Sequence, residues 1–188
     1  ALTYKQHLNA GNAFEVMAWF GFYEASSFSA AGLYEWTQPV INNDLTLLTA
    51  SFGMRIHPFY KSLSQHNGVD FTLPEGSRVF ATADGTVTEA TRRNSSTGLT
   101  VTIDHGNGYQ TRYGHLSKTS VKRGQKVNRG DIIALSGDTG LSLSPHLHYE
   151  VRLNGMRVDP IHYFFMELSP TEYQRLMRIA QSGMQSFD

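Results

Sequence analysis

The 188-residue sequence contains no cysteine, which excludes disulfide bonds and thiolate metal sites. It also carries no net charge, because sixteen basic residues are balanced by sixteen acidic ones. A neutral chain has no general attraction for nucleic acid or for an anionic membrane surface. Its apolar stretches all fall short of the roughly 20 residues that a membrane-spanning helix requires. We therefore expect no nucleic-acid partner, no membrane span in this chain, and a monomer.

A recognisable targeting segment is also lacking. No positively charged stretch precedes an apolar one, and the sequence begins at Ala1 rather than at Met. We interpret the sequence as a mature or trimmed form whose targeting segment is not present in this chain. Because the lack of cysteine is neutral about compartment, the expected location has to follow from the substrate.

The composition divides the chain into three parts. Residues 1–45 are rich in aromatic residues and are punctuated by glycine, which favours one or two short helices. This segment either packs on the back of the main domain or closes its active site. Residues 46–160 contain short β-branched runs between turn residues, the pattern of an all-β core. Residues 161–188 form a C-terminal helical extension, in which Ser169 to Glu172 reads as a capping box with proline at the first helical position.

The fold class expected is mainly β, an antiparallel sheet or sandwich with peripheral N- and C-terminal helices. Asn107-Gly108 and Asn154-Gly155 are typical of tight hairpin turns. Candidate strands are Arg78–Ala81, Thr86–Thr91, Leu99–Asp104, Gln110–His115, Ile132–Ser136, Leu147–Leu153 and Arg157–Val158.

Two histidine motifs carry the chemistry. In His146-Leu147-His148 a strand would point both rings to the same face, because side chains alternate with period two. His66 and Asp70 form a second motif, with a spacing of four. Catalytic zinc takes three protein ligands and keeps one position for water. His66, Asp70 and His148 would complete a site with two histidines and one carboxylate, leaving His146 available for proton transfer.

The sequence around these motifs resembles the lysostaphin/LytM-type zinc endopeptidases of bacterial cell walls. The resemblance runs from about Leu48 to Pro160. It rests on five motifs in the family's order: Ser51–Pro58 (SFGMRIHP), His66–Phe71 (HNGVDF), Tyr113–Ser117 (YGHLS), Gly124–Gly130 (GQKVNRG) and Ser144–Glu150 (SPHLHYE).

The resemblance implies one zinc ion on His66, Asp70 and His148, with His115 and His146 as catalytic histidines and no organic cofactor. It also implies a substrate among the peptide stems or cross-bridges of peptidoglycan, and so a location in the cell envelope, periplasmic or secreted. Zinc would lower the pKa of its water. His146 would take the proton, and His115 would stabilise the oxyanion.

We expect these five side chains on one face of an open sheet, with Asp70 near a strand start and His66 reaching over from a loop. Gly114 would let a substrate approach the backbone closely. The expected groove walls are Lys61–Gln65, Arg92–Gly98 and Gly137–Ser144. Residues expected to be structural are His57, His105, Tyr113 and Tyr149; Arg55 would serve either a substrate carboxylate or a salt bridge.

Two other functions are compatible with parts of the sequence. A catalytically latent relative that binds peptidoglycan or activates an amidase would share the fold, but the five positions are all intact here. A biotinyl- or lipoyl-carrier domain would share the pattern of Ala83–Val87 and Val121–Ala134. Such a carrier displays a lysine in a tight hairpin flanked by Met or Ala, and this sequence has none.

Overall fold

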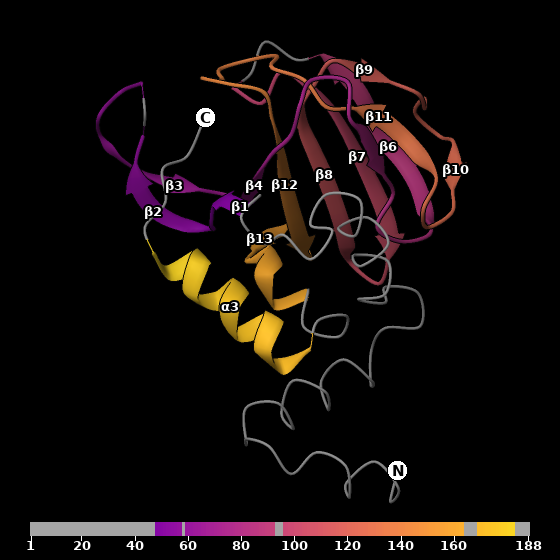
Figure 1. The fold of residues 1–188 in the computed structure, drawn as a ribbon. Coiled ribbons are helices and arrows are strands. Elements are labelled where there is room, and N and C mark those ends of the chain that lie inside the picture. The colour runs from indigo at the N-terminus through magenta and orange to yellow at the C-terminus, as the bar shows by residue number, and fades with distance from the viewer. Residues whose placement is uncertain (1–47, 58, 93–95, 164–168, 183–188) are drawn as a thin grey trace, which may run out of the picture.

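The computed structural model describes residues 48–57, 59–92, 96–163 and 169–182. The helices expected within residues 1–45 lie outside these ranges. Within them, strands dominate, and every strand pairing is antiparallel. This confirms the mainly β fold class, with one α-helix after the sheet in the described part of the chain (Figure 1).

The described strands form one large sheet and two smaller ones. The large sheet has the order β1 (Leu48–Ala50), β4 (Val69–Thr72), β12 (His146–Leu153), β8 (Tyr109–Leu116), β7 (Leu99–Gly106), β6 (Gly85–Arg92) and β10 (Lys126–Val127), with β13 (Met156–Val158) also paired to β12. The second contains β5 (Arg78–Phe80), β11 (Ile132–Leu135) and β9 (Lys118–Thr119). The third is the hairpin of β2 (Gly53–Ile56) and β3 (Leu63–His66), which extends from one side of the molecule (Figure 1).

The seven candidate strands are all present, with ends within two residues of those expected. Both asparagine-glycine turns have the positive φ angles that a tight hairpin needs, about 50° at Asn107 and Asn154 and 80° at the glycines that follow. The short strands β1, β2, β3, β9 and β10 were not predicted, because runs of two to four residues carry too little alternation to be recognised.

The core lies between the large sheet and the sheet of β5, β11 and β9. It includes Val101, Ile103 and Val151 from the large sheet and Val79 and Ile133 from the smaller one, each fully buried. Burial of this apolar surface is the main force that holds the two layers together.

Two tyrosines contribute to the same core. Tyr113 and Tyr149 pack with ring centroids 5.4 Å apart. Their hydroxyl groups stay satisfied, since both form hydrogen bonds with Thr82. The structural role expected for these two tyrosines is therefore confirmed.

The terminal helix α3 (Pro170–Gln181) begins with the expected capping box between Ser169 and Glu172. Leu176 on its inner face is fully buried in the core. Near its end, the Ala180 carbonyl accepts a hydrogen bond of 2.7 Å from the Ser51 hydroxyl. Before α3, a 3-10 helix (Pro160–Tyr163) buries Ile161 in the same core. No helix in the described ranges combines the length and apolarity needed to cross a bilayer.

Candidate functional site

Three ligand-type side chains converge where β3, β4 and β12 meet. Asp70 on β4 pairs in register with His148 on β12, so their side chains share one face of the sheet. Asp70 Oδ1 lies 2.8 Å from His148 Nδ1 and 3.1 Å from His66 Nε2, and the two ring nitrogens are 3.2 Å apart. All three side chains are buried. Their potential ligand atoms all lie within 4.8 Å of one another, which fits a metal site.

The neighbours of the two rings fix which nitrogens carry hydrogen. His66 Nδ1 lies 2.8 Å from the Ser51 carbonyl oxygen, which can only accept, so Nδ1 must donate. His148 Nε2 lies 3.5 Å from a Glu150 carboxylate oxygen, which favours a hydrogen there too. The lone pairs of His66 Nε2 and His148 Nδ1 therefore point toward Asp70. Three electron-rich atoms in contact need a cation among them, and the donor set of two imidazoles and a carboxylate suits zinc.

The same contacts act on the Asp70 carboxyl group. Burial raises the pKa of Asp70, but when no metal is bound and the His66 and His148 rings are protonated, their charges and hydrogen bonds lower it well below its usual range. Beside a cation, whether imidazolium or metal, Asp70 is ionised, as a metal ligand must be.

Gly68 explains the close approach of the first motif to β12. A Cβ atom at this position would lie 2.3 Å from the Tyr149 carbonyl oxygen and 3.0 Å from His148 Nε2. Only glycine lets the chain between His66 and Asp70 pass so near. The expectation that His66 reaches over from a loop needs correction. It is the last residue of β3 and pairs with Gly53, because the unpredicted β2–β3 hairpin continues to that point.

His146 and His115 form a second pair beside this cluster. His146 lies two residues before His148 on β12 and shares its face. The ring centroids of His115 and His146 are 4.3 Å apart, and those of His115 and His148 are 6.0 Å apart. The structure thus brings the five expected side chains together. Their roles as ligands and catalysts stay predictions.

His115 reaches this face through a bulge. Strict alternation along β8 would place it on the core side with Tyr113. Instead the register with β7 shifts between Tyr113 and Leu116, and His115 adopts a left-handed φ of 57°. A bulge re-aims a side chain in this way. The neighbouring Gly114 packs against His148 and Thr97, where a Cβ would be 3.4 Å from each, rather than facing open space for a substrate.

The segment Gly137–Ser144 sets the orientation of both rings. The Thr139 carbonyl accepts a 2.7 Å hydrogen bond from His115 Nδ1. The Ser144 carbonyl does the same for His146 Nδ1 at 2.8 Å, and the Ser142 hydroxyl lies 3.1 Å from that nitrogen. In both rings this tautomer places the lone pair on Nε2, the nitrogen that can accept a proton.

A cavity of about 370 Å³ opens beside the cluster of His66, Asp70 and His148, called the metal-type cluster below. Two of the three expected walls contribute to it: Ser64 and Gln65 from the first, and Ser96 and Thr97 from the second. Residues 137–144 are not among its lining and lie instead behind His115 and His146. The complete lining is Arg55, His57, Ser64, Gln65, His66, Asn67, Ser96, Thr97, Arg112, His148, Glu150 and Arg157.

Two other histidines are held by structural contacts. His105 is buried between the Asp84 carbonyl, 2.8 Å from Nδ1, and the Thr111 hydroxyl, 2.7 Å from Nε2. His57 Nδ1 accepts hydrogen bonds from the backbone of Phe59 and Tyr60 in the turn that follows. No role for Glu150 beside His148 was predicted from the sequence. Its position two residues after His148, on the same face of the strand, could have indicated it as a partner for that ring.

Comparison with known proteins agrees with this geometry. ShyA of Vibrio cholerae serotype O1, a peptidoglycan DD-endopeptidase, is 50% identical over 105 residues, which are 56% of this chain and 24% of ShyA. This chain thus spans about a quarter of the length of such curated relatives. A zinc-containing peptidase from Vibrio cholerae superimposes with a TM-score of 0.56 at 42% identity, covering 60% of this chain and 35% of that one.

The catalytic domain of lysostaphin, an antimicrobial peptidase from Staphylococcus simulans, superimposes with a TM-score of 0.56 at 32% identity, over 61% of this chain and 89% of that domain. Residues 64–160, just over half of the sequence, match peptidase family M23. This range includes the metal-type cluster of His66, Asp70 and His148 and also the pair of His115 and His146. The chain belongs to peptidase family M23.

Proposed function

We propose that this chain is a zinc-dependent endopeptidase that hydrolyses peptide cross-links or bridges of bacterial peptidoglycan. The observation that carries the proposal is the convergence of His66, Asp70 and His148 beside the His115–His146 pair in a family M23 domain. The activity named for ShyA supports the choice of substrate. The proposed catalytic domain is 46–160, flanked by 1–45 and 161–188, and its substrate would place it in the cell envelope.

His66, Asp70 and His148 would hold one zinc ion. Bound there, zinc would supply an activated water and a Lewis acid for the scissile carbonyl. The protein's own part begins with His146. Its Nδ1 hydrogen is held by the Ser144 carbonyl, so Nε2 can take a proton as water attacks and return it to the leaving amine.

His115 has a different part to play. Because the Thr139 carbonyl accepts its Nδ1 hydrogen, His115 can donate through Nε2 only as an imidazolium. In that form it would stabilise the negative charge that develops on the carbonyl oxygen.

A catalytically latent binding or amidase-activating protein is the alternative. Such a protein needs the groove but has no need of five intact chemical side chains. The buried cluster of two imidazole rings and one carboxylate is a donor set that suits catalytic zinc, which favours the enzyme.

The test is digestion of purified peptidoglycan, with the released muropeptides identified by mass. Zinc-loaded protein should generate new peptide ends, and His146→Ala should generate none while retaining its zinc. His162→Ala is the matched control, since His162 is exposed on the 3-10 helix away from the cavity lining. Zinc-loaded protein that cleaves no wall type would refute the enzyme and favour the latent alternative.

A further inference from the structure

The sheet face that carries the metal-type cluster continues into a group of basic side chains. Along β12, residues 146, 148, 150 and 152 alternate onto this face. Glu150 pairs in register with Arg112 on β8, and Arg152 pairs with Arg157 on β13. The face therefore changes within one strand from imidazoles to guanidinium groups.

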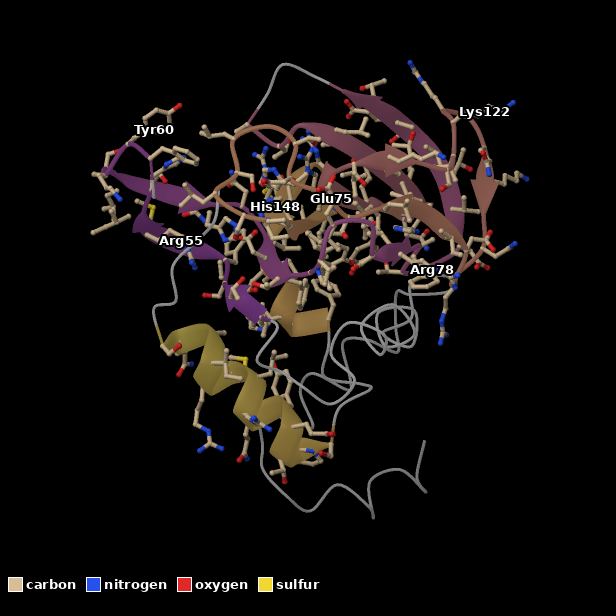
Figure 2. All side chains as sticks on the ribbon, turned by 45° about the horizontal axis from the view of Figure 1, so that its top comes forward. Arg55, Tyr60, Glu75, Arg78, Lys122 and His148 are labelled. Atoms are coloured by element: carbon tan, nitrogen blue, oxygen red, sulfur yellow. The ribbon has the colours of Figure 1, made fainter. Side chains whose placement is uncertain are left out.

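Three arginines from three different strands line the cavity beside the cluster: Arg55 from β2, Arg112 from β8 and Arg157 from β13. Figure 2 shows Arg55 beside His148, and both line the same cavity. In a chain without net charge, this concentration of positive charge is local.

One carboxylate, that of Glu150, also lines the cavity, but it does not balance the three cations. Arg152, which is not part of the lining, donates to Glu150 Oε2 at 2.6 and 3.0 Å. Arg157 Nε reaches the same oxygen at 3.3 Å. Glu150 is thus shared by Arg152 and Arg157, and its single negative charge leaves the three lining arginines with an excess of positive charge.

Arg112 adds a second indication. Burial lowers the pKa of its guanidinium group even though Glu150 acts in the opposite sense. One nitrogen donates to the Thr97 hydroxyl at 3.1 Å, while its buried Nε has no hydrogen-bond partner among the described residues. A desolvated guanidinium group of this kind gains from an anion that enters the cavity.

We propose that Arg55, Arg112 and Arg157 form a subsite for a free carboxylate group of the substrate peptide, close to the scissile bond. This inference rests on the proposed function and adds a substrate preference to it. Guanidinium groups present paired donors that match a carboxylate, and they do so best where water is partly excluded. His66 and His148 line the same cavity as the three arginines. A peptide whose carboxylate binds the arginines would therefore place its neighbouring peptide bond near the proposed zinc site.

The experiment uses pairs of synthetic peptides that differ only in one group, a free carboxylate or a carboxamide on a residue flanking the scissile bond. Binding is measured calorimetrically to the zinc-loaded full chain carrying His146→Ala, so that it does not depend on turnover. Hydrolysis of the same pairs is measured with the unmodified zinc-loaded chain.

We expect the carboxylate peptide to bind about tenfold more tightly, which is the size of a charge-assisted hydrogen bond. Added to the His146→Ala protein, Arg157→Gln or Arg55→Gln should reduce this preference to about twofold or less, with little effect on binding of the carboxamide. Arg78→Gln is the matched control, because Arg78 is exposed on β5 at the far end of the molecule (Figure 2) and should leave the preference intact.

The outcomes separate the two proposals. Equal binding of both peptides, or an equal loss for both in the arginine variants, would overturn the carboxylate subsite and leave the peptidase standing. A retained binding preference without cleavage by the unmodified chain would support the subsite as a binding site and overturn the proposed hydrolysis.

Discussion

Replacing Glu150 by Gln should weaken zinc binding, since Glu150 supports the ring of a proposed ligand. Its carboxylate is buried, with 2% of the residue exposed, and lies 3.5 Å from His148 Nε2. In metal sites, losing such an outer partner of a histidine ligand typically costs about 10- to 100-fold in affinity. The 3.5 Å separation is long for a hydrogen bond. We therefore expect the lower end of that range, about tenfold or ~1.4 kcal/mol.

The assay is competition for zinc against a chromophoric chelator at neutral pH. Gln keeps the shape and an acceptor oxygen, so a loss of affinity reports the charge rather than a cavity. Glu172→Gln is the matched control: Glu172 lies on α3, and Gln can also complete its capping box. A zinc affinity for Glu150→Gln within twofold of the unmodified protein would refute the reasoning and show that other contacts suffice to orient His148.

Three further changes test the fold and its charges. Leu176→Ala should lower the urea unfolding free energy by about 3 kcal/mol, because the side chain is fully buried; a loss below 1 kcal/mol would mean that α3 is not part of the core. Gly68→Ala should cost about 3 kcal/mol and reduce zinc content, since its Cβ collides with the Tyr149 carbonyl; unchanged zinc content would contradict that contact. Burial raises the pKa of Glu150, but His148 and Arg152 bring it from 4.5 to about 2. A carboxylate whose pKa is lowered by folding stabilises the protein above its unfolded pKa, so metal-free protein should lose this stability between pH 4.5 and 2, and Glu150→Gln should lose less over that range; parallel urea curves would contradict it.

The strands that carry the site were predictable because their sequences alternate strongly. His146, His148 and their face follow from period two on a strand whose other face reads Leu147, Tyr149 and Val151. The helix start at Ser169 was equally explicit, since a capping box is a local pattern.

The placement of His115 was not derivable in the same way. Alternation assigns it to the core face, and only a bulge with a left-handed residue turns it toward His146. A bulge depends on the partner strand and on the Thr139 carbonyl, 24 positions along the chain, so no local pattern announces it. The correct expectation for His115 came from the family resemblance alone. The end of β3 at His66 was missed for a related reason, because a four-residue hairpin strand has no signal of its own.

Ser51 has a consequence for how this protein should be shortened. Its hydroxyl is anchored to Ala180 near the end of α3, and its carbonyl receives the hydrogen of His66. A fragment cut to the family boundaries, residues 64–160, would keep every proposed zinc ligand, including His66, yet discard Ser51 and Ala180. Without the Ser51 carbonyl, His66 would be able to rotate and change tautomer. The fragment would then contain all three ligands but bind the ion more weakly. Expression boundaries for this protein should therefore run from before Ser51 to beyond Gln181.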